Sequence, residues 1–315
     1  MVTILMAVYN GGSYLKEQLE SIRRQTYTKW KLIVRDDGSS DNPAEVLSEF
    51  AASTDNEVTV FINNPPEGSA KKNFARLIKD ASSSQYIMFC DQDDIWKDDK
   101  IEISIKAMKK LEAKYGSNMP LLVHGDLEVA DQDMNIISGS MFALSHINRH
   151  PSLAELVIQN NVTGCTMLIN QPLCKGVTSI AGMEDVIMHD YIIALYARVF
   201  GKTAFINKPL LSYRQHGSNS VGAKDNNSPK YLLKRLKDGR EAYKEAMLLS
   251  YKQTALFAKI YRKTLYNRNM YNEYKFLSQY GALHKKGYLY RIQFYFRNGV
   301  WKKGFFRKIM QCIWG

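Results

Sequence analysis

The sequence predicts an α/β fold in which helices flank a mostly parallel central sheet, followed by a helical C-terminal extension. Three observations predict this fold. Apolar runs of strand length alternate with segments whose apolar residues recur at helical spacing. Polar clusters follow several of these runs directly, as they do at the ligand-binding edge of parallel sheets. Charge and aromatic content change near residue 230, which separates the extension.

Short apolar runs rich in β-branched and aromatic residues are the predicted strands: residues 2–8, 31–34, 58–62 and 86–89. The first run has no basic segment before it and no cleavage site after it, so we interpret it as a strand rather than a leader.

Segments with apolar residues three or four positions apart are the predicted helices. Their apolar faces are Leu15, Leu19 and Ile22; Phe74, Leu77 and Ile78; Ile101, Ile105, Met108 and Leu111; and Tyr191, Ile192, Leu195 and Val199. Asp98 or Asp99 is expected to cap the third of these helices.

Length and cysteine content narrow the class of protein. A chain of 315 residues can hold one large α/β domain with an appendage, or two domains. The cysteines are scattered, without a C-x-x-C pair for zinc or redox chemistry, which favours a reduced, cytoplasmic protein. No apolar run approaches the length of a membrane span.

The net charge of +12 belongs to the C-terminal segment. Residues 230–315 hold 20 Lys and Arg against 4 Asp and Glu, together with 19 of the 36 aromatic residues. The preceding residues carry a net charge of −4. We therefore expect a boundary between two compositional units within the polar stretch 217–229.

Polar clusters stand directly after predicted strands, at Tyr9-Asn10, at Asp36-Asp37 and at Asp91 to Asp94. Carboxylates packed as closely as those of residues 91–94 repel one another unless a cation lies between them. Oxygen ligands of this kind suit Mg²⁺ or Mn²⁺. An isolated D-x-D would more often be a solvated acidic turn, but three clusters at one sheet edge favour a ligand site.

The order and spacing of three motifs carry a resemblance: Ala7-Val8-Tyr9-Asn10, Asp36-Asp37-Gly38-Ser39-Ser40-Asp41 and Asp91-Gln92-Asp93-Asp94-Ile95-Trp96. Together they resemble the family 2 inverting glycosyltransferases, whose Rossmann-like fold is called GT-A. Met188-His189-Asp190-Tyr191 and the run 211–222 are similar to the bacterial rhamnosyltransferase branch, which uses dTDP-L-rhamnose to build surface polysaccharides. The resemblance implies a catalytic domain at 1–222, with a nucleotide-sugar half at 1–100 and an acceptor half at 101–222, and leaves 223–315 as the helical extension.

The resemblance implies roles for individual residues. Those expected around the donor nucleotide are Ala7, Tyr9, Asn10, Asp36, Asp37, Lys72, Asn73, Arg76, Asp91 and Gln92. Asp91, Asp93 and His216 are the expected ligands of a divalent metal, Mn²⁺ or Mg²⁺, on the donor diphosphate. Which of Asp91, Asp93 and Asp94 coordinates directly stays open. The residues expected near the donor or acceptor sugar are Asp94, Trp96, Thr163, Gly164, His189 and Arg214.

Glycosyl transfer needs a general base for the acceptor hydroxyl, typically an Asp or Glu. Asp185 and Asp190 are the candidates, and we choose Asp190 because it begins a predicted helix and matches the rhamnosyltransferase motif. Helix capping would equally explain an aspartate there. For Trp96, packing is at least as good an interpretation as sugar stacking, and Arg214 would suit a diphosphate oxygen.

The predicted activity is therefore transfer of L-rhamnose from dTDP-L-rhamnose to a lipid-linked surface polysaccharide precursor. Transfer from another nucleotide sugar such as a UDP-hexose, a metal-dependent nucleotidyltransferase and a nucleic-acid-binding protein are the alternatives. The last would depend on the extension alone, and we expect no nucleic-acid partner.

The basic and aromatic extension, residues 230–315, suits an anionic membrane surface, so we expect a peripheral location on the inner face of the bacterial membrane. Apolar residues at helical spacing favour amphipathic helices there: Leu232, Leu233, Leu236, Phe305, Phe306, Ile309 and Met310. Alternatively, its aromatic residues pack against the catalytic domain or against a second subunit in a homodimer.

Overall fold

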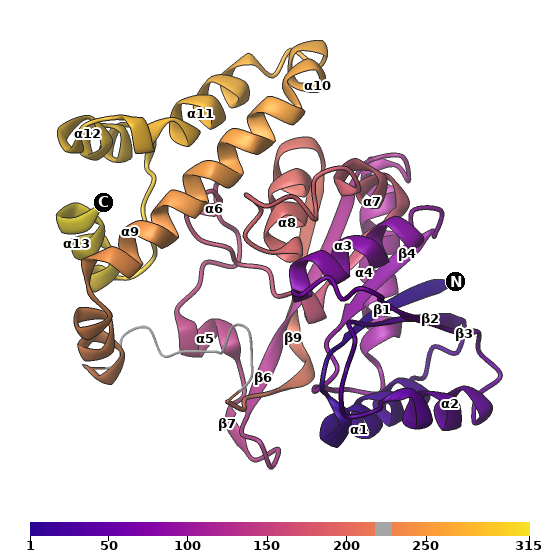
Figure 1. Cartoon of the computed structure of the whole chain (residues 1–315). Helices are drawn as coiled ribbons and strands as arrows, with labels where there is room; N and C mark the ends of the chain where they lie inside the picture. Colours follow the sequence, from indigo (N-terminus) through magenta and orange to yellow (C-terminus); the bar gives the residue numbers. More distant parts are fainter. Residues whose placement is uncertain (218–228) are drawn as a thin grey trace.

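The computed structural model describes residues 1–217 and 229–315, without the side chains of residues 229–238 and 305. A central sheet has the strand order β3-β2-β1-β4-β8-β6-β9-β5, with β7 beside β6 (Figure 1). The strands are β1 (Val2–Val8), β2 (Trp30–Asp36), β3 (Val58–Ile62), β4 (Tyr86–Cys90), β5 (Ile95–Trp96), β6 (Leu121–Ala130), β7 (Ile136–Ser138), β8 (Leu168–Asn170) and β9 (Lys202–Arg214).

The N-terminal half of the sheet is parallel, as predicted. β1 lies between β2 and β4, and β3 lies beyond β2, all in one direction. β8 runs antiparallel to both β4 and β6, and β6 pairs in parallel with β9. The predicted strands at 2–8 and 58–62 are confirmed over their full length, the strand at 31–34 extends to residues 30–36, and the strand at 86–89 extends by one residue, Cys90.

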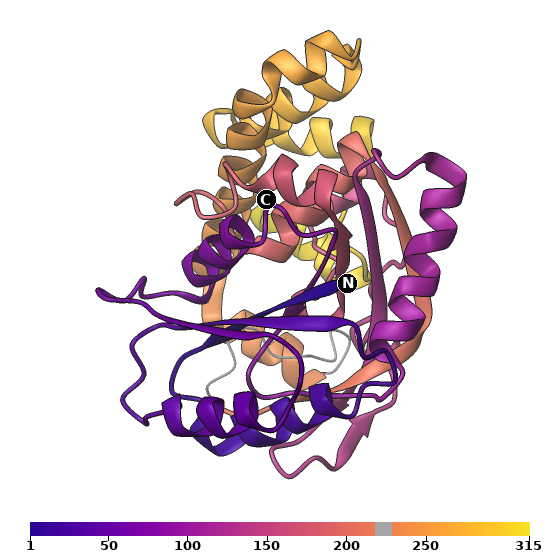
Figure 2. The same ribbon diagram turned by 90° about the vertical axis from the view of Figure 1, so that its right-hand side faces the viewer.

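Helices cover both faces of the sheet, and the C-terminal helices follow them in the chain (Figures 1 and 2). The helices of the first 217 residues are α1 (Gly12–Arg23), α2 (Ala44–Ala52), α3 (Ala70–Asp80), α4 (Lys100–Tyr115), α5 (Met141–Ser145), α6 (Leu153–Leu156), α7 (Gln171–Val177) and α8 (His189–Phe200), with a 3-10 turn η1 (Gly164–Thr166). Apolar residues of α1, α2 and α4 pack in one core cluster, and those of α3, α7 and α8 in another.

The predicted cap of α4 is wrong in its chemistry. Asp99 occupies the N-cap position, but its side chain makes no capping hydrogen bond. Its carboxylate instead accepts a hydrogen bond from Lys208 Nζ at 2.6 Å. The Asp99 carboxylate therefore pairs with Lys208 of β9 and does not cap the helix.

The C-terminal region packs on the α8 side of the sheet (Figure 1). It consists of α9 (Pro229–Ile260), α10 (Arg262–Asn267), α11 (Tyr271–Gly281), η2 (Leu283–Lys285), α12 (Tyr288–Asn298) and α13 (Phe305–Trp314), with a break in α9 at Gly239. Much of its aromatic content is buried: Tyr243, Tyr251, Phe257, Tyr261, Tyr280, Phe294 and Tyr295. Of these, Phe257 and Tyr261 pack against Tyr196 and Phe200 of α8, so for these two residues the alternative of packing against the first part of the chain is confirmed.

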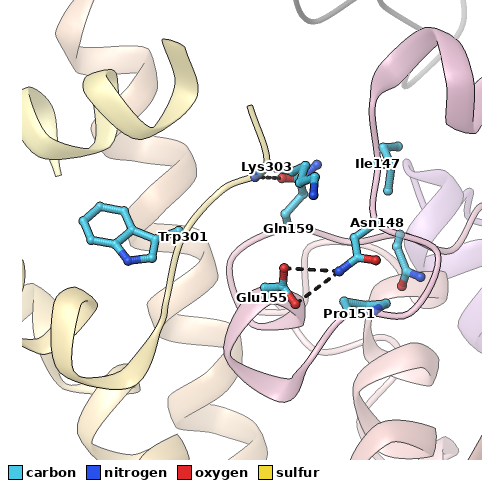
Figure 3. A pocket seen from close by; sticks show the side chains of 8 residues that line it. Ile147, Asn148, Pro151, Glu155, Gln159, Trp301 and Lys303 are labelled. Atoms are coloured by element: carbon cyan, nitrogen blue, oxygen red, sulfur yellow. Dashed lines mark hydrogen bonds between the residues drawn. The ribbon is translucent and has the colours of Figure 1, made fainter. Parts of the chain in front are cut away.

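Polar contacts fix the same interface. Tyr261 donates its hydroxyl to Gly176 O at 2.6 Å, and Ser250 donates to Val157 O at 2.7 Å. Figure 3 shows a third contact, where the backbone N–H of Lys303 donates to Gln159 Oε1 at 3.0 Å. The catalytic part and the extension therefore share one core.

Two predictions for the extension lie outside the described part of the chain. The boundary within 217–229 falls on residues 218–228, and the side chains of Leu232, Leu233, Leu236 and Phe305 are not described. Among the described helices none is both long and apolar enough to cross a membrane.

Candidate active site

The acidic loop between β4 and β5 is tied to the end of β1. Tyr9 N donates to Gln92 Oε1 at 2.8 Å, and Gln92 Nε2 donates to Tyr9 O at 3.0 Å. Because β1 and β4 are parallel neighbours, this pair of hydrogen bonds holds Asp91 to Asp94 at the carboxyl edge of the sheet. The structure thus brings together two of the predicted strand-end clusters, Tyr9-Asn10 and Asp91 to Asp94. Ala7, another predicted donor residue, lies on β1.

Gly11 makes room for the Gln92 side chain, since a Cβ at this position would lie 2.2 Å from Gln92 Cδ. We expect Gly11→Ala to displace the acidic loop and to weaken donor binding, with a stability loss of about 1–3 kcal/mol from overpacking. Gly139→Ala is the matched control, because a Cβ added there would have no atom of the described residues within 4 Å. Thermal unfolding and nucleotide titration of both variants would check this, and equal donor affinity for the two would contradict it.

Asp36 and Asp37 are buried rather than part of an exposed turn. The Asp36 carboxylate accepts hydrogen bonds from Ser39 N at 3.0 Å and Ser39 Oγ at 2.5 Å. The Asp37 carboxylate accepts from Glu67 N at 2.6 Å and Gly68 N at 2.9 Å. Both carboxylates therefore shape the loops beside the ends of β1 and β2.

Asn10 joins this edge to the loop after β2. Its backbone is in the left-handed region, at φ 49°, which asparagine tolerates better than most residues. Its Oδ1 accepts from Ser40 N at 2.8 Å, and its N–H donates to Ser39 Oγ at 2.9 Å. Tyr9 beside it is exposed and presents its ring at the same edge.

The predicted donor residues of α3 separate into buried and exposed positions. Asn73 is buried and donates to Arg35 O at 3.0 Å, so it supports β2 and the loop after β3. Lys72 is exposed, and Arg76 is exposed with an ion pair to Glu67 at 2.7 Å. Lys72 and Arg76 are therefore the residues of this set that solvent reaches.

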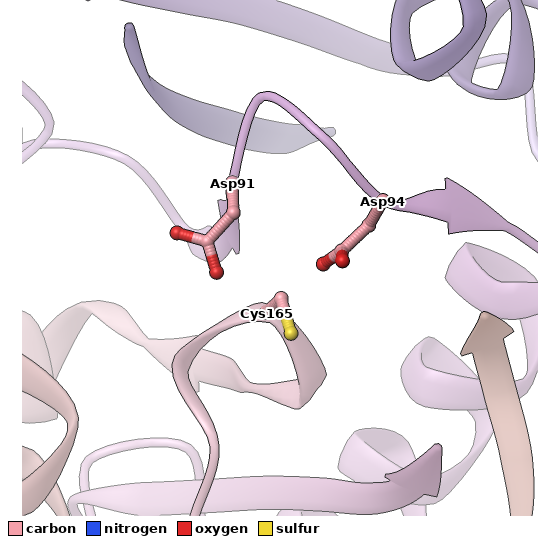
Figure 4. Close-up of side chains that lie close together, drawn as sticks. All are labelled: Asp91, Asp94 and Cys165. Atoms are coloured by element: carbon pink, nitrogen blue, oxygen red, sulfur yellow. The ribbon is translucent and has the colours of Figure 1, made fainter. Parts of the chain in front are cut away.

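Asp91 and Asp94 face each other with Cys165 between them (Figure 4). One ligand atom of each lies within 4.8 Å of the others. Burial, and then the charges of Asp93 and Asp190, raise the pKa of Asp91 to about 7. Burial, and then the charges of Asp91 and Asp93, raise the pKa of Asp94 well above its ordinary value. Because the buried carboxylates of the acidic loop repel one another, their charged forms are destabilised.

Asp93 and His216 come together from positions far apart in the sequence. His216 Nε2 lies 2.7 Å from Asp93 Oδ2, and each side chain is 12% exposed. Carboxylate oxygen and imidazole nitrogen are both acceptable ligands of Mn²⁺. The predicted ligand set of Asp91, Asp93 and His216 thus contains one observed pair, at a position that solvent reaches.

Arg214 holds the acidic loop instead of facing a ligand. Its guanidinium donates to Asp93 O at 2.9 Å, to Gln132 O at 2.6 Å and to Glu17 Oε2 at 2.5 Å. Its backbone N–H donates to Asp94 Oδ1 at 3.3 Å. This buried arginine was predicted near the sugar or diphosphate, and its contacts favour a positioning role.

Asp190 is the second residue of α8, so it is not the N-cap, which is Met188. The backbone N–H groups of Tyr191 and Gly164 lie near its carboxylate and favour the charged form, and Oδ1 is buried without a hydrogen-bond partner among the described residues. Its charge is one cause of the raised pKa of Asp91, which places it beside the acidic loop. Of the two candidate bases, Asp190 therefore has the better-defined position.

Asp190 predicts a pH dependence of transfer. Burial raises its pKa to about 7, against the backbone N–H donors that favour its charged form. Only the unprotonated carboxylate accepts a proton, so we expect kcat/KM to rise with pH and to level off above about pH 7. A profile at saturating metal would check this, and a flat profile between pH 5 and 8 would contradict it.

The remaining sugar-site predictions fall on supporting residues. Trp96 is almost fully buried, so the packing alternative fits it better than sugar stacking. His189 is buried and stacks on Phe74 and Phe89, with ring centroids 4.0 and 5.2 Å apart. A Cβ on Gly164 would lie 2.8 Å from His189 Nε2, so this glycine permits close packing. Thr163 is the residue before η1 and is half-buried.

Two residues at the site were missed. Lys100 is fully buried beneath the acidic loop, where Nζ donates to Cys165 O at 2.8 Å and lies 4.5 Å from the centre of the Trp96 ring. Burial lowers its pKa to about 8. Cys165 lies between two carboxylates. A lysine at a helix start and a lone cysteine carry no pattern that would have revealed either position.

The sequence matches the model of Glycosyl transferase family 2 over residues 3–118. It is 31% identical over 236 residues to the dTDP-rhamnosyl transferase RfbG of Shigella flexneri, covering 72% of this chain and 76% of that protein. The chain belongs to glycosyl transferase family 2. A second relative is the UDP-Glc:alpha-D-GlcNAc-diphosphoundecaprenol beta-1,3-glucosyltransferase WfgD of Escherichia coli, 29% identical over 54% of this chain and 59% of WfgD.

This family 2 glycosyltransferase has the GT-A fold. The S. aureus protein TarS, solved in complex with UDP, superposes with a TM-score of 0.54 at 15% identity, covering 81% of this chain and 65% of the TarS chain. The predicted family, fold and enzyme class are confirmed. The acidic loop and Asp190 thus lie close together in a family 2 nucleotide-sugar glycosyltransferase.

Proposed function

We propose that this chain transfers L-rhamnose from dTDP-L-rhamnose, with inversion, to a hydroxyl of a lipid-linked surface polysaccharide precursor. The observation that carries the proposal is the position of Asp190 at the start of α8, beside Gly164 and the acidic loop. The 31% identity with a dTDP-rhamnosyl transferase supports the donor. The name of WfgD, whose acceptor is a diphosphoundecaprenol, supports a lipid-linked acceptor.

The reaction needs a base on one side of the sugar and charge stabilisation on the other. Asp190 takes the proton of the acceptor hydroxyl while that oxygen forms a bond to the anomeric carbon. The bond from this carbon to the diphosphate oxygen breaks, and the electron pair leaves with dTDP. Because the attack is in line, a β-linked donor gives an α-linked product.

Asp93 and His216 are the residues that fit a divalent cation on the diphosphate. Their ligand atoms are 2.7 Å apart, and both side chains are reached by solvent, as a shared site with a diphosphate requires. Asp94 and Cys165 are fully enclosed, and burial raises the pKa of the Cys165 thiol, which keeps it protonated. A bound cation supplies Lewis-acid stabilisation of the leaving diphosphate.

A thermal-shift screen of nucleotide sugars, each with and without Mn²⁺, tests the proposed donor. Binding to the native state raises stability by mass action, so dTDP-L-rhamnose with Mn²⁺ is expected to give the largest shift. A larger shift with UDP-glucose would replace the rhamnosyl proposal by transfer of a hexose. Failure of every nucleotide diphosphate to shift the melting temperature would overturn the proposed function.

We assign the proposed membrane contact to α12 and α13. Residues 274–315 contain no Asp or Glu, whereas nine Lys and Arg lie among them. Leu289 is 81% exposed, Phe296 67% and Ile313 60%. Exposed apolar side chains among cations suit the headgroup region of an anionic leaflet. This face would place the enzyme on the membrane that holds its acceptor.

Substitution of the exposed apolar residues tests this surface. We expect Leu289→Glu with Phe296→Glu to lower co-sedimentation with phosphatidylglycerol vesicles at least about tenfold, because each change replaces membrane-facing apolar area by a charge. Tyr271→Glu is the control, since Tyr271 is 53% exposed but lies on α11. Vesicle binding that survives the double substitution and is insensitive to salt would contradict the assignment.

A further inference from the structure

An open cleft of about 560 Å³ lies along α8, away from the acidic loop. It is bounded by α8, by the beginnings of β6 and β9, and by the segment 149–162. One wall is apolar and consists of Leu122, Pro151, Leu153, Leu156, Val162, Ala194, Ala197 and Val199. None of these residues belongs to the site described above.

The cleft exists because α8 carries small residues on this face. Ala194 and Ala197 are both buried and line the cleft, whereas neighbouring positions of α8 hold tyrosine, isoleucine and leucine. They follow Asp190 by four and seven residues, so they lie on the face of the helix that presents the base. At 1.5 Å per residue, they lie about 6 and 10 Å from Asp190 along the helix.

The rim of the cleft is cationic. Arg149, Arg198 and Lys202 line it, and none of them forms an ion pair with a carboxylate of the described residues. Glu273 of α11 is the one carboxylate among the lining residues that the structure describes. Positive charge is therefore in excess in a cleft whose lining contains both polar and apolar side chains.

A buried polar group completes the lining. His124 is 3% exposed, and its Nδ1 has no hydrogen-bond partner within the described part of the chain. Burial, and then the charge of His150, lower the pKa of His124 to about 3, so the ring is neutral at pH 7. A neutral imidazole can donate one hydrogen bond to a ligand oxygen without adding charge.

We propose that this cleft binds the isoprenyl-diphosphate end of the acceptor, with the diphosphate at Arg149, Arg198 and Lys202 and the first part of the chain on the apolar wall. The guanidinium fork matches phosphate oxygens in pairs. An apolar wall with a few placed cations is the lining that an amphiphilic phosphate needs. The proposal rests on the proposed function, because it names the part of the acceptor that extends from the sugar at Asp190.

The position of the cleft separates it from the donor. The predicted donor residues gather at the ends of β1, β2 and β4, whereas the cleft includes the starts of β6 and β9. Ala194 and Ala197 of the cleft lie on the same face of α8 as Asp190. An acceptor sugar at Asp190 would thus have its isoprenyl diphosphate on the α8 side and the donor nucleotide on the opposite side.

Calorimetric titration of the full-length protein with geranyl diphosphate tests the site. Saturating dTDP and Mn²⁺ fill the donor site first, so that the probe reports the cleft. Inorganic pyrophosphate is titrated to measure binding of the anion alone, and geraniol to measure binding of the isoprenyl chain alone. The variants are Arg149→Ala with Arg198→Ala, and the control Lys110→Ala with Lys114→Ala removes two exposed cations from α4.

Geranyl diphosphate is expected to bind the wild type and the control equally, and the Arg149 and Arg198 variant at least about tenfold more weakly, because two charge-assisted contacts are lost. Pyrophosphate and geraniol are expected to bind more weakly than geranyl diphosphate. Unchanged affinity in the arginine variant would overturn the proposal, and so would pyrophosphate binding as tightly as geranyl diphosphate.

The same titrations separate this proposal from the proposed function. If dTDP binds with Mn²⁺ but geranyl diphosphate does not, the cleft is not the lipid-phosphate site and the transferase proposal stands. If dTDP itself does not bind, the proposed function fails, whatever the cleft binds.

Discussion

Asp190→Asn is expected to lower kcat about a thousandfold, within the range that general bases contribute, while the affinity for dTDP with Mn²⁺ stays unchanged. The amide keeps the shape of the side chain but cannot take a proton from the acceptor. Single-turnover transfer to the acceptor, with a separate dTDP titration, measures the two effects. Asp185→Asn is the matched control, because Asp185 is the other candidate base and is expected to retain activity.

Asp190→Asn is also expected to stabilise the fold above pH 7. Burial raises the folded-state pKa of Asp190 from 3.8 to about 7, so ionisation of this carboxyl disfavours the folded state as pH rises through that window. The gain in melting temperature should be present at pH 8 and absent below about pH 4, where the carboxyl is protonated in both states. Full activity of Asp190→Asn, or loss of activity only in Asp185→Asn, would show that the base is misassigned.

Asp93→Asn is expected to lower kcat/KM at least about a hundredfold, comparable to the loss of one transition-state charge contact. The variant should also lose the Mn²⁺ dependence of dTDP binding, because the Asp93 and His216 pair would no longer hold the cation. His216→Ala is likewise expected to lower kcat/KM and to weaken the Mn²⁺ dependence of dTDP binding. Titration of Mn²⁺ in the presence of dTDP measures it.

The control for Asp93 is Asp133→Asn, an exposed aspartate in the turn before β7. Comparison of Asp94→Asn with Asp93→Asn shows which carboxylate binds the cation, since Asp94 is enclosed with Cys165 whereas Asp93 is reached by solvent. If Asp94→Asn abolishes Mn²⁺ binding and Asp93→Asn does not, the cation belongs to the enclosed set, and the assignment to Asp93 and His216 is wrong.

The meeting of strand-end clusters at one edge of the sheet could be predicted because its signals are local. β1, β2 and β4 are buried apolar runs that pair in parallel, so the residues that follow them meet at one edge of the sheet. The clusters at Tyr9-Asn10 and at Asp91 to Asp94 therefore lay together, joined through Gln92. Asp190 could be chosen over Asp185 because a helix with a periodic apolar face begins beside it.

Other assignments depended on what surrounds each side chain. From the sequence, Trp96 could equally stack on a sugar or pack in the core. Its burial beside Lys100 favours packing in the core. Arg214 was plausible on a diphosphate, but its guanidinium bonds three protein oxygens. The aromatic residues of the extension were plausible on a membrane, but many of them are buried in a core cluster that includes residues of the first part of the chain.

The sequence by itself determined the α/β class, the family and the three strand-end clusters, because strand and helix periodicity and short motifs act over a few residues. The tertiary structure decided which charged groups face solvent and which hold the loops, since this depends on atoms far apart in the chain. It paired Asp93 with His216, enclosed Asp94 with Cys165, and left the α8 cleft open through two alanines. Desolvation and packing make these choices, and neither is a property of a single segment.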